Sequence, residues 1–296
     1  MQIRPMTLKD VPQLPAVHAG SEGPWLDPVE GAIWINHRLV RPFTIDVAVW
    51  GDVAVGHAEW ILGDERGALG RQLYLAMLQV HPDYRGRGVG RAMIEHGRER
   101  AQQLSCRWIR LLAEEGAEGF YLKCGFRPGA QIHTYAVPVQ HTDWPAGWQR
   151  VRSVPKRAVR AFPMRLGWVQ ASSTFMWELC NRPVRMAGAQ AHHPCGKRTG
   201  TGAPAYVQLR HLGGFKETLV LAWGPGSEAA EDYLPAAMAL AQGLAVDTLR
   251  VVLPETEAIG VAKCGRLVDQ QPLWEWAVTQ QGTKAVNQTE GGSANR

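Results

Sequence analysis

The sequence lacks the features that anchor a chain in a membrane or fix it with disulfides. It contains no apolar run of about 18 residues or more, the length needed to span a bilayer. Its opening residues, Met1–Pro5, lack the apolar run of a secretory signal. Five cysteines are an odd and dilute set, which favours a reducing compartment over a disulfide framework. We therefore expect a cytoplasmic protein without a membrane anchor.

Acidic residues are nearly absent from one stretch of the chain. Residues 150–216 contain twelve Lys or Arg and one acidic residue, Glu178, although the net charge of the chain is only +5. Such a segment could attract nucleic acid or another polyanion. No motif for nucleic-acid binding accompanies it, so we interpret it as a solvated basic face.

The length and composition fit two domains. The chain is 45% hydrophobic and 20% charged, which is typical of globular proteins, and its 296 residues suit two units of ordinary size. Strand-like and helix-like segments alternate, which predicts an α/β (α+β) fold with a mixed central sheet flanked by helices. We expect a first domain over residues 1–140, a linker over 141–149 and a second domain over 150–281. The polar residues 282–296 predict a disordered tail.

Hydrophobic patterning places the elements of the first domain. Two strands around Gly51-Asp52 predict a hairpin, and the apolar run Leu73–Val80 predicts a strand buried on both faces. Thr7 and Asp10 have the spacing of a capping box. The other expected elements are a strand at Ile3–Met6, a helix over Val29–Leu39, a helix of about fifteen residues after a glycine-rich turn, a strand at Trp108–Ala113, a helix around Ala117–Cys124 and a strand at Ile132–Val139.

The strongest chemical signal is the glycine-rich turn that follows Leu73–Val80. Glycine lets backbone N–H groups approach an anion where a Cβ would obstruct, and a helix N-terminus adds unpaired amides and partial positive charge. The turn therefore predicts a phosphate site, with a tight packing turn as the alternative. It is not a Walker loop, because no Gly-Lys-Ser/Thr follows. The turn consists of Arg85, Gly86, Arg87, Gly88, Val89, Gly90 and Arg91.

Two motifs in this order resemble those of the GNAT acetyltransferase superfamily. The family's pyrophosphate motif, Arg/Gln-x-x-Gly-x-Gly/Ala, fits Arg85–Gly90 at every fixed position. The family's second motif, Ala-x-x-Phe/Leu-Tyr-x-x-x-Gly-Phe, resembles Ala117–Phe126. The opening Ile3–Thr7 with Asp10 is also typical of the family. The resemblance covers roughly residues 1–140 and implies a GNAT-type sheet with acetyl-CoA as acyl donor.

The resemblance also implies roles for individual residues. Leu78, Gln79 and Val80 match a splayed strand whose free backbone amides hold the pantetheine and the acetyl oxygen. Tyr121 matches the proton donor to the departing CoA sulfur, a role that suits a phenol because it is still protonated at neutral pH. Glu114 stands where many relatives have an Asn that contacts the pantetheine. The implied cofactor-binding set is Leu78, Gln79, Val80, Arg85, Gly86, Arg87, Gly88, Val89, Gly90, Arg91 and Glu114.

An amine that attacks a thioester also needs a base. Leu73–Val80 carries no carboxylate, although some relatives keep one on this strand. We predict Glu59, on the hairpin strand beside His57, as the base. The alternatives are Glu114, Glu115 and His81 acting through water. Three tryptophans, Trp25, Trp34 and Trp60, could wall an amine pocket or pack in the core.

The second half contains a degenerate copy of the first. A shift of 140 residues aligns 89–125 with 229–265 without a gap, and eight of the 37 positions are identical. Opposite Arg85–Gly90 stands Pro225–Ala230, in which Glu228 would repel a pyrophosphate, and opposite Tyr121 stands Val261. We predict a tandem arrangement with an intact first domain and a degenerate GNAT-like second domain.

The sequence thus predicts an acetyl-CoA-dependent N-acetyltransferase that works by direct attack of a small-molecule or protein primary amine in a ternary complex, without metal. The alternative is a non-catalytic acyl-CoA-sensing module whose basic half binds nucleic acid or protein. Tyr121 favours the enzyme, because a sensor needs no proton donor. One further cluster has zinc-ligand types but not the spacing of a recognised finger, so we interpret it as an ordinary loop. Its members are Cys180, His192, His193 and Cys195.

Overall fold

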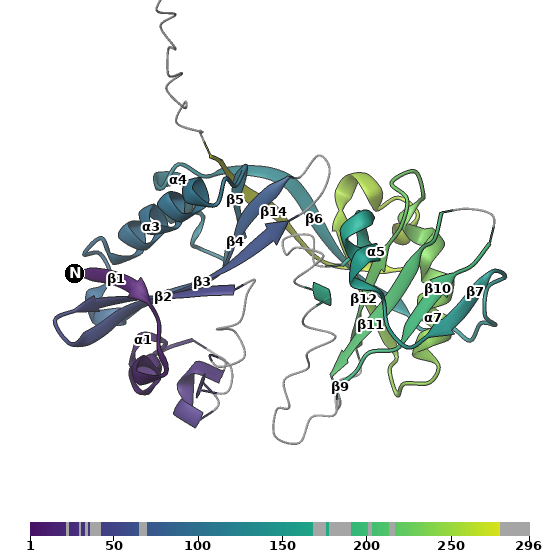
Figure 1. Ribbon diagram of the computed structural model, residues 1–296, viewed down its shortest axis with the longest axis horizontal. Helices are drawn as coiled ribbons and strands as arrows, with labels where there is room; N and C mark the ends of the chain where they lie inside the picture. The colour runs from purple at the N-terminus through teal and green to yellow at the C-terminus, as the bar shows by residue number, and fades with distance from the viewer. Residues whose placement is uncertain are drawn as a thin grey trace, which may run out of the picture.

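The computed structural model describes residues 1–21, 24–29, 31–32, 35, 43–64, 70–167, 176–177, 191–200, 203–212 and 217–278. These residues form one continuous mixed sheet with helices packed against it (Figure 1). In the described part of the chain, no helix is long and apolar enough to cross a membrane. The order along the sheet is β1-β2-β3-β4-β5-β14-β6-β13-β12-β11-β10-β7, with β8 and β9 attached to β12 and β11.

The strands of the first half appear where the hydrophobic pattern places them, and the same holds for its main helix. They are β1 (Gln2–Pro5), β2 (Phe43–Trp50), β3 (Val53–Asp64), β4 (Arg71–Val80), β5 (Trp108–Leu112) and β6 (Arg127–Pro138). The helices are η1 (Leu8–Gln13), α1 (Leu14–Val17), η2 (Pro24–Leu26), η3 (Pro82–Tyr84), α3 (Val89–Gln103) and α4 (Glu118–Lys123).

The second half repeats much of this order with shorter helices. Its strands are β7 (Trp148–Val151), β8 (Met164–Leu166), β9 (Ala191–His192), β10 (Cys195–Arg198), β11 (Tyr206–Leu212), β12 (Glu217–Trp223), β13 (Thr248–Pro254) and β14 (Arg266–Ala277). Its helices are α5 (Lys156–Ala161), η4 (Ala230–Tyr233), α7 (Leu234–Ala241), η5 (Glu255–Glu257) and η6 (Val261–Lys263).

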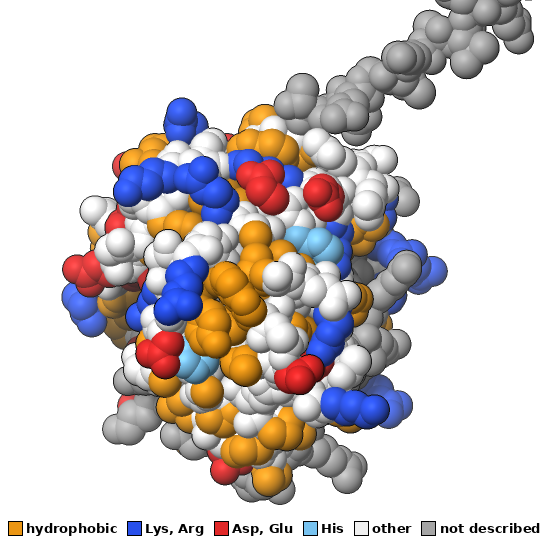
Figure 2. All heavy atoms as spheres, turned by 90° about the vertical axis from the view of Figure 1, so that its left-hand side faces the viewer, with side chains coloured by type: hydrophobic (Ala, Val, Ile, Leu, Met, Phe, Trp, Pro, Cys, Tyr) orange, Lys and Arg blue, Asp and Glu red, His pale blue; other side chains and the backbone are white. Residues whose placement is uncertain are grey.

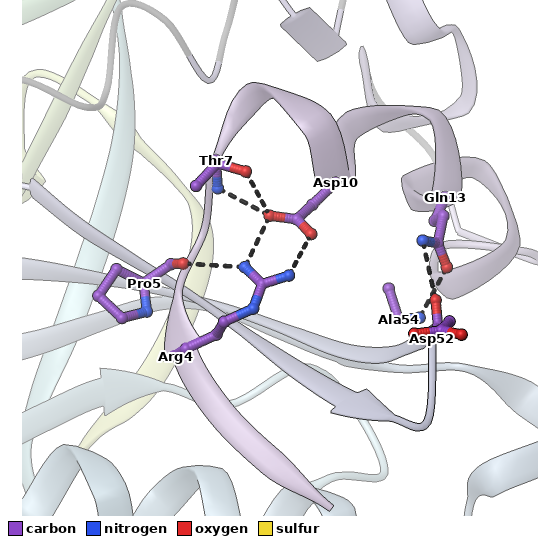
Figure 3. A network of polar contacts seen from close by, with 7 residues as sticks. All are labelled: Arg4, Pro5, Thr7, Asp10, Gln13, Asp52 and Ala54. Carbon is purple, nitrogen blue, oxygen red and sulfur yellow. Dashed lines mark hydrogen bonds and ion pairs between the residues drawn. The ribbon is translucent and has the colours of Figure 1, made fainter.

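The predicted capping box at the start of the chain is present, although it caps a 3₁₀ helix (Figure 3). The carboxylate of Asp10 accepts hydrogen bonds from the Thr7 backbone N–H at 2.8 Å and from the Arg4 guanidinium at 2.6 and 2.9 Å. Burial raises the pKa of Asp10, but these bonds outweigh it and leave the pKa below its usual value. The network fixes η1 against β1.

The two halves exchange strands. β14, near the end of the chain, lies between β5 and β6 of the first half, and β6 in turn pairs with β13 of the second half. Trp274 of β14 is 5% exposed and belongs to the same core as β3 to β5 and α3. The part of the sheet that belongs to each half is therefore incomplete without a strand from the other half.

The exchange follows a pseudo-two-fold axis between β6 and β14. Trp108 of β5 pairs with Ala277 of β14, and Thr248 of β13 pairs with Pro138 of β6. These two pairs correspond in the repeat, because Trp108 and Thr248 are 140 residues apart and Pro138 and Ala277 are 139 residues apart. The internal repeat predicted from sequence is therefore a repeat of structure. The exchange itself was not predicted, because a one-dimensional alignment does not say which copy of a strand a sheet receives.

The strand expected over Leu73–Val80 is present, but its burial differs from the expectation. Burial of Leu73–Val80 on both faces was wrong for its second part: Leu73–Leu75 are buried, but Ala76 is exposed and Met77–Val80 are half-buried. Met77–Val80 pair with β3 on one side, but on the other side, where β5 has separated, the residues after Leu75 line a cavity, described below. Most of the helix expected over Val29–Leu39 and all of the tail 282–296 lie outside the described residues.

Candidate active site

The site begins where two parallel strands separate. β4 pairs with β5 only from Gln72 to Tyr74, opposite Trp108 to Arg110. Beyond Tyr74 the described residues give β4 no partner on that side, so the backbone groups of its second part face open space. On the other side, the register with β3 shifts between Glu59 and Trp60, leaving Ala76 as the extra residue of a β-bulge.

A cavity of about 670 Å³ occupies this gap. β4 supplies one wall, the loop after β5 and helix α4 supply the other, and the turn after α1 closes part of the rim. The residues that line it are Gly20, Ser21, Leu75, Ala76, Met77, Leu78, Gln79, Val80, Arg85, Leu112, Glu114, Glu115, Gly116, Ala117, Phe120 and Tyr121. Leu78, Gln79, Val80, Arg85, Glu114 and Tyr121, which the resemblance singled out, thus come together around one space.

The glycine turn lies at the phosphate-binding end expected for such a cavity. Gly86 and Gly88 have φ angles of 74° and 84°, and a Cβ at either position would meet no heavy atom within 4 Å. Gly88 is the N-cap residue of α3. At Gly90 a Cβ would lie 3.2 Å from the Phe120 ring and 3.6 Å from a Val80 methyl group. The helix start is therefore next to two residues of the cavity wall.

This geometry fits a pyrophosphate. An open, left-handed glycine turn at the N-terminus of a 15-residue helix presents backbone N–H groups and partial positive charge to the same place. Arg85, held by a hydrogen bond from its Nε to the Val80 carbonyl at 3.2 Å, adds a cation at the rim. The exposed Arg87 lies over the Tyr84 ring, with 5.2 Å between its Cζ and the ring centroid.

The outer surface of the first half mixes apolar and basic groups. Figure 2 shows this face, with hydrophobic side chains gathered near its middle and Lys or Arg side chains spread around them. Trp50 and Val53, at the tip of the β2–β3 hairpin, are 45% and 42% exposed.

Tyr121 joins the core to the cavity. Its ring packs edge-on against Phe120 and Phe126, with centroid distances of 5.1 and 5.8 Å, and the residue is 8% exposed. Burial raises the pKa of Tyr121 well above its usual value near 10, and the neighbouring Glu114 carboxylate raises it further. The phenol therefore keeps its proton throughout the neutral range and is available as a hydrogen-bond donor.

The candidate bases are in different places. Glu114 and Glu115 are exposed and line the cavity. Glu59 is fully buried behind β4, where it lies opposite Met77 of the cavity wall and does not itself line the cavity. The Nδ1 atom of His81 accepts a hydrogen bond from the Asp83 N–H at 3.2 Å, at the start of η3.

None of the described tryptophans walls the cavity. Trp60 is fully buried under α3, where Gly97 makes room for its ring, and Trp25 is 3% exposed and stacks on His18 at 5.4 Å. Both pack in cores, while Trp34 lies outside the described residues. Sequence reasoning missed Gly20 and Ser21, which no motif marks because they reach the cavity only through the path of the chain after α1.

The corresponding gap in the second half is filled. β12 pairs in parallel with β13 only from Glu217 to Leu219, as β4 does with β5. The strand β8 then enters: it pairs with the end of β12, and the N–H of Gly167 donates to the Val252 carbonyl of β13 at 3.0 Å. Leu166 of β8 is fully buried. Among the described residues no strand of the first half occupies the corresponding place, whereas in the second half β8 occupies the space where a thioester arm would lie.

The turn of the second half also carries its own anion. Glu228 forms an ion pair with Arg198, accepts a hydrogen bond from the Tyr233 hydroxyl at 2.6 Å, and its backbone carbonyl accepts one from Arg165 at 2.7 Å. Burial raises the pKa of Glu228, but Arg198 and Tyr233 outweigh it, so the carboxyl is ionised at neutral pH. Val261, opposite Tyr121 in the repeat, is buried in the core.

Metal ligands do not converge in the part of the chain described: it contains no group of three or more His, Cys, Asp or Glu that could hold an ion. Of the four zinc-ligand types noted in the sequence, Cys180 lies outside that part. The thiol of Cys195 donates to the His193 carbonyl at 3.2 Å.

Comparison with known proteins agrees with the geometry. Residues 42–128 match the family described as an acetyltransferase (GNAT) domain. No match was found among curated proteins. A tandem GNAT protein from the clavulanic acid biosynthesis pathway, solved without AcCoA, superposes with a TM-score of 0.59 at 18% identity, over 94% of this chain and 98% of that one.

Two further solved structures cover nearly the whole chain. A GCN5-related N-acetyltransferase from Anabaena variabilis gives a TM-score of 0.64 at 13% identity, over 94% of this chain and 73% of that one. A conserved protein of unknown function and probable N-acyltransferase from Enterococcus faecalis gives 0.64 at 13% identity, over 95% and 73%. At these identities the likeness shows the fold, which is that of two tandem GNAT units.

Proposed function

Because the chain carries a GNAT acetyltransferase domain at residues 42–128, we propose that it transfers an acyl group from acyl-CoA, with acetyl-CoA as the expected donor, to a primary amine. The observation that carries the proposal is the cavity between the separated strands β4 and β5, with a left-handed glycine turn near one end and the Tyr121 phenol in its wall. The co-substrate supplies a thioester, whose carbonyl carbon accepts the amine.

Binding would use backbone more than side chains. The turn Arg85–Arg91 holds the pyrophosphate, because Gly86 and Gly88 leave open space and α3 directs its first N–H groups there. Among the described residues, the second part of β4, Met77–Val80, has no strand partner on the cavity side, and it offers N–H groups to the pantetheine arm and to the thioester oxygen. Glu114, which replaces an Asn, offers acceptor oxygens at the same wall.

Tyr121 would stabilise the departing thiolate. A thiol has a pKa near 8.5, so complete proton transfer from a phenol with a raised pKa is uphill. The hydroxyl instead donates a strong hydrogen bond to the sulfur as negative charge develops on it. The surrounding Phe120 and Phe126 rings hold the donor in place and exclude water from one side.

Direct attack in a ternary complex needs no covalent intermediate on the protein. None of the described residues that line the cavity is a cysteine, and among them Ser21 and Tyr121 carry hydroxyl groups. The amine would enter from the rim formed by Gly20, Ser21 and Glu115, opposite the second part of β4. The basic second half would complete the sheet and bind no second molecule of acyl-CoA.

The experiment that tests the proposal is release of free thiol from acetyl-CoA across a panel of primary amines, including amino acids, polyamines, aminoglycosides and lysine peptides. We expect amine-dependent release with at least one class, and formation of the acetylated amine in equal amount. Binding of acetyl-CoA with no thiol release for any amine would contradict the proposal and favour a sensing role.

A further inference from the structure

Two histidines from distant parts of the sequence meet behind the cavity wall. His18, at the end of α1, and His57 of β3 are 1% and 0% exposed. Their ring atoms Nε2 of His18 and Nδ1 of His57 are 2.8 Å apart, a hydrogen bond in which one ring donates and the other accepts. Trp25 packs against both rings, with centroid distances of 5.4 and 5.0 Å.

The inner end of this pair meets a carboxylate. The Nε2 atom of His57 lies 3.5 Å from Oε1 of Glu59, and both side chains are completely buried. On the sheet, His57 is opposite Gln79 and Glu59 is opposite Met77, and both of these β4 residues line the cavity. The three ionisable groups thus form a line directly behind the wall of the candidate active site.

The outer end reaches the cavity. The hydroxyl Oγ of Ser21 lies 3.5 Å from Nδ1 of His18 and donates to the His18 carbonyl at 2.7 Å. Ser21 lines the cavity, whereas His18 does not. Because one hydroxyl carries one proton, Oγ of Ser21 donates either to the carbonyl, which is the shorter contact, or to Nδ1 of His18, and a proton can pass to Nδ1 only in the second arrangement.

A carboxylate at Glu59 would give the line one direction. Its Oε1, 3.5 Å from Nε2 of His57, would attract the Nε2–H proton, so that Nδ1 of His57 would accept from Nε2–H of His18 and Nδ1 of His18 would be left unprotonated towards Ser21. Burial lowers the pKa of His18 to about 4, so its ring is neutral near pH 7 and able to accept a proton.

The surroundings supply few competing charges. From β2, Val47 faces the pair, while the neighbouring Asp46 is ion-paired with Arg100 of α3 on the opposite face. From β4 the facing polar group is the neutral Gln79, and from η2 it is Trp25. Within the described residues, Glu59 is therefore the acidic group that could orient both rings.

Resting on the proposed function, we propose that Ser21, His18, His57 and Glu59 form a proton relay that removes the proton of the acceptor amine. The amine proton passes to Oγ of Ser21 as the Ser21 proton passes to Nδ1 of His18. The Nε2 proton of His18 passes to Nδ1 of His57, and the Nε2 proton of His57 passes to Glu59. Each ring ends in its other tautomer, the carboxylate gains one proton, and the reverse sequence restores the line after product leaves.

The relay explains how a carboxylate that cannot touch the cavity acts as a base. Ser21 is the member that would contact the amine, and the other three are positioning residues that act through it. Glu114 and Glu115 also line the cavity, but both are exposed, so solvent screens their charges.

The first test reads the tautomers directly in the full-length protein, by two-bond ¹H–¹⁵N correlation of the imidazole rings near pH 7.5. We expect His18 and His57 both to carry the proton on Nε2, and Glu59→Gln to change at least one of them, because an amide can donate to the ring. A proton on Nδ1 of His18, or tautomers that ignore Glu59→Gln, would overturn the relay whether or not an acceptor amine is known.

The second test uses kinetics with acetyl-CoA and the amine that gives the fastest thiol release. His18→Gln and Glu59→Gln should lower kcat/KM by about 10²-fold and should shift the acid limb of the pH–rate profile, with the affinity for CoA unchanged. His96→Gln, on the opposite face of the sheet, is the control. Equal kcat/KM and an unshifted profile in a folded Glu59→Gln variant would contradict the relay, whereas no thiol release by the wild type would contradict the proposed function itself.

Discussion

Arg110 of β5 and Glu275 of β14 form an ion pair, with 2.7 Å between Nη2 and Oε1, that joins two strands more than half the chain apart. Arg110 also donates to the side-chain oxygen of Gln72 at 3.1 Å, so the pair connects β4, β5 and β14. The strand β14, which pairs with β5 next to the candidate active site, thus comes from the second half. The second half therefore contributes directly to the sheet that carries the candidate active site.

The strand exchange predicts that the first half does not fold alone. Residues 1–140 without β14 would expose the edge of β5 and lose Trp274 from the core. We expect this fragment to lack cooperative thermal unfolding and CoA binding, measured by calorimetry. Within the full chain, Trp274→Ala should cost about 3 to 5 kcal/mol of unfolding free energy, while Trp50→Ala at the exposed hairpin tip should cost little. A stable fragment that binds CoA would contradict the exchange.

Removal of the Tyr121 hydroxyl should affect the chemistry and spare the packing. Tyr121→Phe keeps the ring between Phe120 and Phe126 but withdraws the hydrogen bond to the developing thiolate. We expect kcat for thiol release to fall by about 10²-fold, with the Kd for CoA within a factor of about two, measured by steady-state kinetics and calorimetry. Phe120→Leu, which alters the packing and retains the hydroxyl, is the control. If Tyr121→Phe turns over at the wild-type rate, the phenol has no part in thiolate departure.

His18 makes stability depend on pH in a defined direction. Its pKa is lowered by burial from about 6.5 to about 4, so the unfolded chain binds a proton that the folded chain rejects. The contribution of neutral His18 to the free energy of unfolding is fully present above pH 6.5. It decreases by up to about 3 kcal/mol as the pH falls through the folded-state pKa. Denaturant unfolding of wild type and His18→Gln should therefore differ less at pH 4.5 than at pH 7.5. The exposed His141 supplies the control, His141→Gln, and a difference independent of pH would contradict the assignment.

Reversal of one substitution should not restore a site in the second half. Glu228→Gly removes the internal carboxylate, but β8 still fills the gap between β12 and β13. We expect the variant to bind one CoA per chain, like the wild type, in a calorimetric titration. Binding of a second equivalent of CoA would show that Glu228 alone excludes the co-substrate and that CoA can displace β8.

Much of the candidate site followed from local sequence, and the rest did not. The turn at Gly86 and Gly88, the helix that begins after Gly88 and the aromatic surroundings of Tyr121 are contiguous in sequence, so spacing predicted them. Three other features depend on which distant segments of the chain come together in the folded structure. They are the contact between His18 and His57, the place of Ser21 in the cavity lining and the insertion of β14. No pattern of period or propensity encodes such long-range pairings. For that reason the sequence places His57 beside Glu59 but does not predict that His18 lies against His57.

The central claim, one CoA bound at the glycine turn of the first half, is tested most directly by calorimetric titration of the full-length protein with acetyl-CoA. Wild type should bind one equivalent, and Gly88→Glu should abolish binding, because its carboxylate would lie at the start of α3 where the pyrophosphate is held. Gly51→Glu has a matched left-handed backbone and open surroundings at the hairpin tip, and it should bind like the wild type. Two equivalents in the wild type, or unchanged affinity in a folded Gly88→Glu variant, would contradict the account.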